Sequence, residues 1–184
     1  MSYNTKAVIL SRRPYLEDDC LVTMFTQRYG KIQAKAISAL KPTSKLRGHL
    51  EQGRLVDVML TQIDRQGKLA QIITLKNYAS SDPVRFTALT AILELTELMS
   101  QPTPDILLWE SVDWALTRVR EISSVDQLIS VLSASMMKML DSGGIGMESA
   151  SSLGQIHAHI QWNLGKKINS LSKIGALELK QTIN

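Results

Sequence analysis

Residues 28–54 read RYGKIQAKAISALKPTSKLRGHLEQGR, and the organisation of the chain follows from this stretch. Side chains alternate between the two faces of a β-strand. The start of the stretch therefore puts Ile32, Ala34 and Ala36 on one face of a strand, while two lysines lie on the other face. One face can pack in a core while the other offers ammonium groups to solvent or to phosphate.

The same stretch is strongly basic. It holds seven basic residues against one acid, Glu51, whereas the whole chain carries a net charge of +4. A concentration of cationic side chains attracts polyanions, nucleic acids among them. A solvated basic face without a partner is the alternative interpretation. The seven basic residues are Arg28, Lys31, Lys35, Lys41, Lys45, Arg47 and Arg54.

Further β-rich segments lie on both sides of this strand. The five predicted strands cover residues 6–10, 20–26, 31–37, 54–63 and 69–75. Residues 64–67 are predicted to form the turn between the last two strands. The connections are short, and none holds a helix long enough for a crossover between parallel strands. This pattern predicts a small antiparallel barrel of the OB type.

The second half of the chain has the apolar spacing of helices. Asp82 and Pro83 suit the N-cap and the first position of a helix. Ser124 and Gln127 have the capping-box spacing that predicts the start of a third helix. One or two weaker helices, separated near Gly165, are predicted towards the end of the chain.

The sequence thus predicts a multi-domain α+β chain. An OB-type antiparallel β-barrel is expected in residues 1–80, followed by an all-α helical domain in residues 81–184. Charge follows a similar division, because residues 1–82 carry +6 and the remainder carries −2. The junction at 78–82 is too short for a flexible linker, so we expect the two domains to tumble together.

Motifs of common enzymes are missing from the sequence. It contains no P-loop, GxGxxG, GxSxG or HExxH motif, so we expect no enzymatic activity. The single cysteine, Cys20, lies in an apolar run and is interpreted as a buried, inert thiol. His157 and His159 would point apart on a helix and make a poor metal pair, and His49 is interpreted as a surface histidine. Residues 17–19 are acidic and are interpreted as a turn, not as metal ligands. Taken together, these interpretations lead us to expect neither a metal nor a cofactor.

The apolar segments are short. No window approaches the length of a membrane helix, and the N-terminus lacks the pattern of a secretory signal. We therefore expect a cytoplasmic protein that does not bind a membrane.

Aromatic residues near the basic stretch are candidates for stacking on bases. Single strands are held by a positive groove together with aromatic ring faces. Tyr15, Phe25 and Tyr29 lie near the basic stretch, and Tyr29 is the preferred candidate because it lies at a strand end. The alternative for Tyr29 is a core tyrosine that closes the barrel.

Three stretches resemble the RecO family of bacterial DNA repair proteins. They are AVILSRRPYLEDD at 7–19, LVTMFTQRYGKI at 21–32 and KPTSKLRGHLEQGRLVDV at 41–58. Beyond residue 82 the resemblance rests on helical architecture and on MLDSGG at 139–144. It implies an N-terminal OB barrel joined to a helical C-terminal domain.

The resemblance also implies a function, that of a recombination mediator acting at the bacterial nucleoid. Such a protein binds single- and double-stranded DNA and anneals complementary strands. With a RecR-type partner, it loads recombinase onto DNA coated by single-stranded-DNA-binding protein (SSB), whose acidic C-terminal tail contacts the helical domain. Many members carry a four-cysteine zinc site in the helical domain, and this chain has no cysteine there.

Two groups of residues are the candidate binding sites. For nucleic acid they are Arg12, Arg13, Arg28, Tyr29, Lys31, Lys35, Lys41, Lys45, Arg47 and Arg54. For the SSB tail they are Arg118, Arg120 and Lys138, chosen on charge alone. Two alternatives remain: a basic OB-fold RNA-binding protein, and an adaptor whose helical half binds proteins while the basic face is idle.

Overall fold

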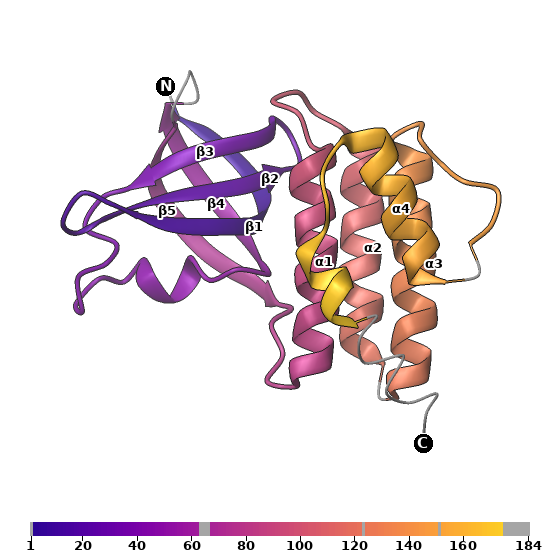
Figure 1. Ribbon diagram of the computed structural model, residues 1–184. Helices are drawn as coiled ribbons and strands as arrows, with labels where there is room; N and C mark the ends of the chain where they lie inside the picture. The colour runs from indigo at the N-terminus through magenta and orange to yellow at the C-terminus, as the bar shows by residue number, and fades with distance from the viewer. Residues whose placement is uncertain (1, 63–66, 123, 151, 175–184) are drawn as a thin grey trace. The chain divides into compact units, whose positions relative to one another are not determined.

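The computed structural model describes residues 2–62, 67–122, 124–150 and 152–174 (Figure 1). The chain divides into two compact units. One holds Met1–Ala79 with Ser100–Ile106, and the other holds Ser80–Met99 with Leu107–Asn184. The predicted turn at 64–67 falls mostly outside the described residues. The expectation that domains 1–80 and 81–184 tumble together stays a prediction.

The first unit is a closed five-stranded barrel, as predicted. Its strands follow one another around the barrel in the order β1-β2-β3-β5-β4. They are β1 (Tyr3–Tyr15), β2 (Asp19–Thr26), β3 (Gly30–Ala36), β4 (Arg54–Gln62) and β5 (Gly67–Asn77). Among the described strands β3 and β5 pair in parallel, and the other neighbours pair antiparallel. Because β2 runs against both β1 and β3, β3 has the same direction as β1. Because β4 runs against both β1 and β5, β5 also has that direction, so β3 and β5 pair in parallel.

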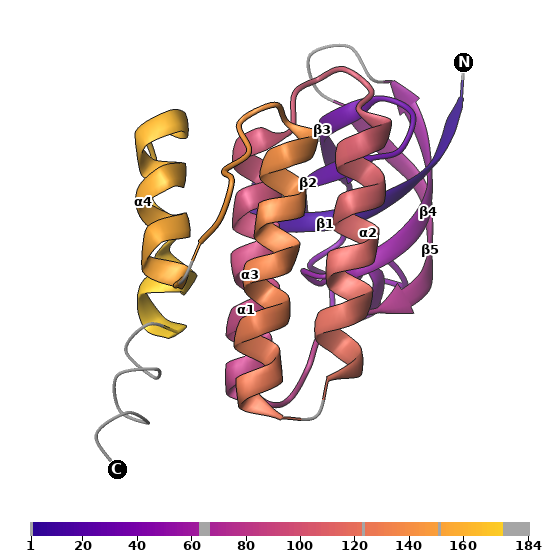
Figure 2. The same ribbon diagram turned by 90° about the vertical axis from the view of Figure 1, so that its right-hand side faces the viewer.

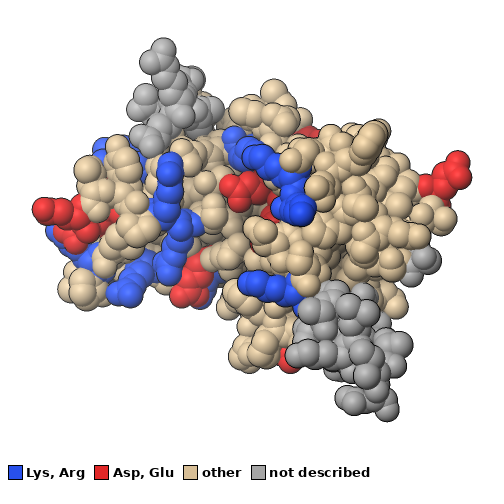
Figure 3. Space-filling model, viewed as in Figure 1, with Lys and Arg blue, Asp and Glu red and all other residues tan. Residues whose placement is uncertain are grey.

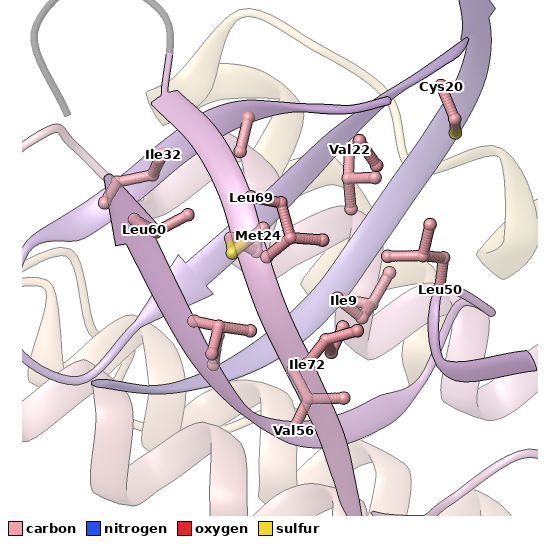
Figure 4. Packing of buried hydrophobic residues seen from close by; sticks show 14 of the residues in the cluster. Ile9, Cys20, Val22, Met24, Ile32, Leu50, Val56, Leu60, Leu69 and Ile72 are labelled. Carbon is pink, nitrogen blue, oxygen red and sulfur yellow. The ribbon is translucent and has the colours of Figure 1, made fainter. Parts of the chain in front are cut away.

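Alternation along the strands fills the barrel (Figure 4). Ile32, Ala34 and Ala36 are buried in the barrel core, as the pattern of β3 predicts. Cys20 is buried in the same core, and this burial raises the pKa of its thiol. A protonated, buried thiol is a poor nucleophile, which agrees with its interpretation as an inert core residue.

The segment between β3 and β4 closes over this core while exposing its charges. It contains a short 3-10 helix, η1 (Arg47–His49). Ala39 and Leu50 reach into the core, whereas the side chains of Lys45 and Arg47 are exposed.

A second segment of the barrel unit approaches β3 closely. The backbone N–H of Lys31 donates to the carbonyl oxygen of Gln101 over 2.7 Å. Gly30 adopts φ +66°, in the left-handed region that favours glycine. A Cβ atom on Gly30 would collide with the carbonyl oxygens of Gln101 and Thr103. Glycine therefore permits both the turn and the close approach.

The second unit is helical. Figure 2 shows α1, α2 and α3 running side by side, and α3 also contacts α4. The helices are α1 (Pro83–Met99), α2 (Ile106–Glu121), α3 (Val125–Ser142) and α4 (Leu153–Leu164), and residues 169–174 are helical again. No helix in the described residues is long and apolar enough to cross a membrane.

The helix boundaries follow the predicted capping residues. Asp82 Oδ1 accepts from the N–H of Arg85 over 2.7 Å, and Ser124 Oγ accepts from the N–H of Gln127 over 3.3 Å. Gly165 ends α4 at φ +68°. Local side-chain chemistry was therefore sufficient to place these ends.

Candidate nucleic-acid interface

Lysine and arginine side chains lie along the face of the barrel shown in Figure 3, with acidic side chains beside several of them. Lys31 and Lys35 are on the outer face of β3, as predicted, and both are half-buried. Lys35 is not directed at solvent alone. Its Nζ lies 2.9 Å from Asp19 Oδ2 and 5.0 Å from the centroid of the Tyr15 ring. β2 thus brings an acid alongside Lys35, and the expected contact between Lys35 and phosphate stays a prediction.

Asp19 is held as a carboxylate. The backbone N–H of Ser38 donates to its Oδ1 over 2.8 Å. This hydrogen bond, followed by the one from Lys35, holds the pKa of Asp19 below its ordinary value. The charge of Lys35 is thus largely matched before any nucleic acid arrives.

Two other predicted phosphate ligands are also paired with acids. Lys41 Nζ lies 3.5 Å from Asp18 Oδ2, and about half of each side chain is exposed. Nη2 of Arg54, the first residue of β4, lies 2.6 Å from Oε2 of Glu51. Exposed pairs of this kind contribute at most about 1 kcal/mol, so a phosphate can displace the acid from Lys41 at little cost.

Five predicted cations take part in none of the ion pairs between described residues. They are Arg12, Arg13, Arg28, Lys45 and Arg47, and all five side chains are exposed. Arg28 follows the C-terminal end of β2, whereas the loop with Lys45 and Arg47 follows the end of β3 that pairs with the start of β2. The structure therefore separates Arg28 from the loop cations by the length of the barrel strands.

Strand register reveals one cation that the sequence interpretation missed. Arg13 pairs with Leu21, Leu21 pairs with Lys35, and Lys35 pairs with Lys68. Lys68 is exposed. Three cations therefore form a row across β1, β3 and β5. Only the parallel β3–β5 pairing brings Lys68 there, and alternation within a strand carries no signal for it.

The Tyr29 ring packs against another tyrosine, whereas its preferred interpretation from the sequence is a ring that stacks on a base. Its ring lies edge-on to Tyr3, with centroids 5.8 Å apart and planes at 89°. Both rings pack against the barrel core. This is the arrangement that the core-tyrosine alternative expects.

His49 is half-buried, so its interpretation as a surface histidine is wrong. Its Nδ1 accepts from the N–H of Thr74 over 3.2 Å and lies 2.8 Å from Thr74 Oγ1. These contacts fasten η1 to β5. They position the loop that carries Lys45 and Arg47.

Known proteins resemble this chain in the same region. A family model described as "Recombination protein O N terminal" matches residues 1–78, which hold all the strands of the barrel. The chain belongs to the RecO family. A "DNA repair protein RecO" of Gloeothece citriformis is 31% identical over 147 residues, covering 78% of this chain and 52% of the relative. Another, of Acaryochloris marina, is 30% identical over 149 residues, covering 78% and 50%.

The chain spans about half the length of these RecO relatives. An alignment of 147 residues is longer than the barrel and extends into the helical unit. The similarity to the family is thus not confined to the OB-type barrel.

The helical unit of this RecO-family chain presents two of its three predicted partner residues together. Lys138 Nζ lies 4.7 Å from the centroid of the Trp114 ring, and the Arg118 guanidinium lies 5.8 Å from it. A pocket of about 380 Å³ adjoins them. It is lined by Trp114, Arg118, Glu121, Ile122, Gln127 and Val131. Arg120 is exposed two residues along α2 and does not line this pocket.

Histidines of the helical unit have backbone partners. His157 Nε2 accepts from the N–H of Ile168 over 3.3 Å, and His159 Nε2 lies 2.7 Å from the carbonyl oxygen of Ile145. Within the described residues, no three His, Cys, Asp or Glu side chains are grouped to hold a metal ion.

Proposed function

We propose that this RecO-family chain binds single- and double-stranded DNA through its barrel and anneals complementary strands in DNA repair. The observation that carries the proposal is the set of exposed cations on an OB-type barrel, led by Lys45 and Arg47 on the loop that His49 fastens down. The names of the RecO relatives point to the same process.

Phosphate binding is the physical basis of this proposal. A cationic side chain that meets a phosphate releases condensed counterions, and this entropy gain favours binding to any sequence. The contacts with the best access are Arg12, Arg13, Lys45, Arg47 and Lys68. Lys41 and Arg54 contribute where their present acidic partners yield, and Lys31 contributes from its half-buried position on β3. Arg28 extends the site towards the other end of the barrel. Lys35 contributes least because Asp19 matches its charge.

Annealing needs no covalent step. Two strands repel one another through their phosphates, and cations bound along each backbone reduce that repulsion. Complementary bases can then pair more often per encounter. A non-enzymatic mode of action therefore suffices for the proposed function, and no cofactor is required.

The proposed mediator role also needs protein partners, namely a RecR-type protein and the acidic C-terminal tail of SSB. The Trp114 pocket has suitable chemistry for such a tail, since Trp114, Ile122 and Val131 offer apolar surface. Arg118 and Lys138 beside the pocket can pair with carboxylates. We expect Arg118→Glu with Lys138→Glu to weaken binding of an acidic peptide with an apolar C-terminal residue at least tenfold. An unchanged affinity would remove the pocket from the proposal.

Strand annealing by the purified chain tests the proposed function. Two complementary labelled oligonucleotides are mixed with and without protein, on bare strands and on strands coated with SSB. We expect faster annealing on both, and slower annealing by the variant Lys45→Gln with Arg47→Gln. Lys166→Gln with Lys167→Gln, on the helical unit, is the matched control. A rate equal to that without protein would refute the annealing proposal, and stronger binding to RNA of the same sequence would favour an RNA-binding protein.

A further inference from the structure

One aromatic ring of the described barrel is exposed next to its cations. Tyr15, the last residue of β1, is 38% exposed. Tyr3 and Tyr29 pack on one another, and Phe25 and Tyr78 are buried. Burying an aromatic ring in a contact is favourable, so an exposed ring beside cations is able to bind a ligand.

Exposed apolar side chains accompany Tyr15 at one end of the barrel. Leu16 is 70% exposed and Ile37 is 44% exposed. Tyr15 pairs with Asp19 across β1 and β2, and Asp19 in turn accepts from Ser38, the residue after Ile37. The C-terminal ends of β1 and β3 therefore bring exposed apolar side chains to the same end of the barrel.

Lys35 holds the Tyr15 ring in place. Its ammonium group lies over the ring, 5.0 Å from the centroid, and is anchored to Asp19 at 2.9 Å. Asp19 is anchored to the backbone of Ser38 at 2.8 Å. A cation over the ring favours this orientation. The ring therefore has a preferred orientation before a ligand arrives.

Charge decides which part of a nucleotide this surface accepts. Glu17 lies in the turn next to Tyr15 and takes part in none of the ion pairs between described residues, and Asp18 is about half exposed beside its partner Lys41, so a phosphate placed here is repelled. A nucleobase is neutral and is not repelled. Phosphate-binding cations lie near by, since Arg13 is two residues before Tyr15 on β1, about 7 Å along the strand.

We propose that Tyr15 is a platform on which a base of single-stranded DNA stacks, while Arg13 and the other exposed cations hold the adjacent phosphates. This inference rests on the proposed DNA binding and adds to it a reason for distinguishing single strands from duplex. Bases in a duplex are stacked on one another and cannot reach the ring. Replacing an aromatic residue that stacks on one base by alanine lowers the affinity for the strand by about 5- to 150-fold.

The affinities of wild type, Tyr15→Phe and Tyr15→Leu for three DNA probes test this inference. The probes are a dT oligonucleotide, an abasic oligonucleotide of the same length and a duplex. We expect Tyr15→Leu to lower affinity for the dT strand about 5- to 150-fold. Its affinity for the abasic strand and the duplex should equal that of wild type, and Tyr15→Phe should behave as wild type on all three.

Three results would overturn the inference. An unchanged dT affinity in Tyr15→Leu means that the exposed apolar surface serves a different partner. Equal losses on the dT, abasic and duplex probes mean that Tyr15 supports the fold or the phosphate contacts. Failure of the wild-type chain to bind any probe refutes the proposed function itself, whereas normal wild-type binding with either of the first two results refutes only the stacking role of Tyr15.

Discussion

The substitution Gly30→Ala tests how Ser100–Ile106, the second segment of the barrel unit, packs against the start of β3. Gly30 has φ +66°, where an L-residue costs about 1–2 kcal/mol more than glycine. The new methyl group would also collide with the carbonyl oxygens of Gln101 and Thr103, so that segment must move. Movement breaks the 2.7 Å hydrogen bond from the Lys31 N–H to Gln101, which contributes about 0.5–1.5 kcal/mol. We expect the free energy of unfolding to fall by about 1.5–3.5 kcal/mol in total.

Two other glycines separate the causes of this loss. Gly144 also has a positive φ, +72°, but a Cβ there meets no atom within 4 Å, so Gly144→Ala reports backbone strain alone. Gly48 has neither feature, and Gly48→Ala should change stability by less than about 1 kcal/mol. Urea unfolding of the three variants measures these differences. If Gly30→Ala lost no more stability than Gly144→Ala, the close approach of Gln101 and Thr103 to Gly30 would be contradicted.

Two further predictions concern the contacts that order the basic surface. The pKa of Asp19 is lower in the folded chain than its ordinary value of 3.8. The ionised carboxylate therefore stabilises the fold at pH values above 3.8, and this stabilisation is lost as the pH falls from 3.8 through the pKa of the folded chain. Thermal unfolding should show wild type more stable than Asp19→Asn at pH 6, with the difference shrinking below pH 3.8; a constant difference down to pH 2 would contradict the assigned contacts with Ser38 and Lys35. His49→Ala removes the acceptor for the Thr74 N–H. Because one hydrogen bond is lost, the rate of amide hydrogen exchange at Thr74 should rise roughly tenfold. Unchanged exchange at Thr74 would show that His49 does not fasten η1 to β5.

Much of the fold could be predicted because its signals are local. The alternation of Ile32, Ala34 and Ala36 with polar residues specifies a strand with one buried face. Asp82 and Ser124 begin helices because their side chains satisfy free N–H groups of the first turn. Each of these signals lies within a few residues of the feature that it predicts.

Features that depend on residues distant in the sequence could not be predicted in this way. Lys68 joins the basic row only through the parallel pairing of β3 and β5. Asp19 reaches Lys35 because β2 and β3 pair in a particular register. Tyr15 and Tyr29 both end or follow a strand, and only the packing of Tyr29 on Tyr3 shows which of the two rings is left exposed.

The salt dependence of DNA binding tests the central claim most directly. If Lys45 and Arg47 each contact a phosphate, the slope of log K against log salt for single-stranded DNA includes about −0.7 from each. Replacing both by Gln should make the slope shallower by about 1.4 and weaken binding to all sequences alike. The control variant Lys166→Gln with Lys167→Gln removes the same charge from the helical unit and should keep the wild-type slope. The account predicts this difference between the two variants; equal slopes in the loop variant and wild type would show that the loop cations are only solvated surface.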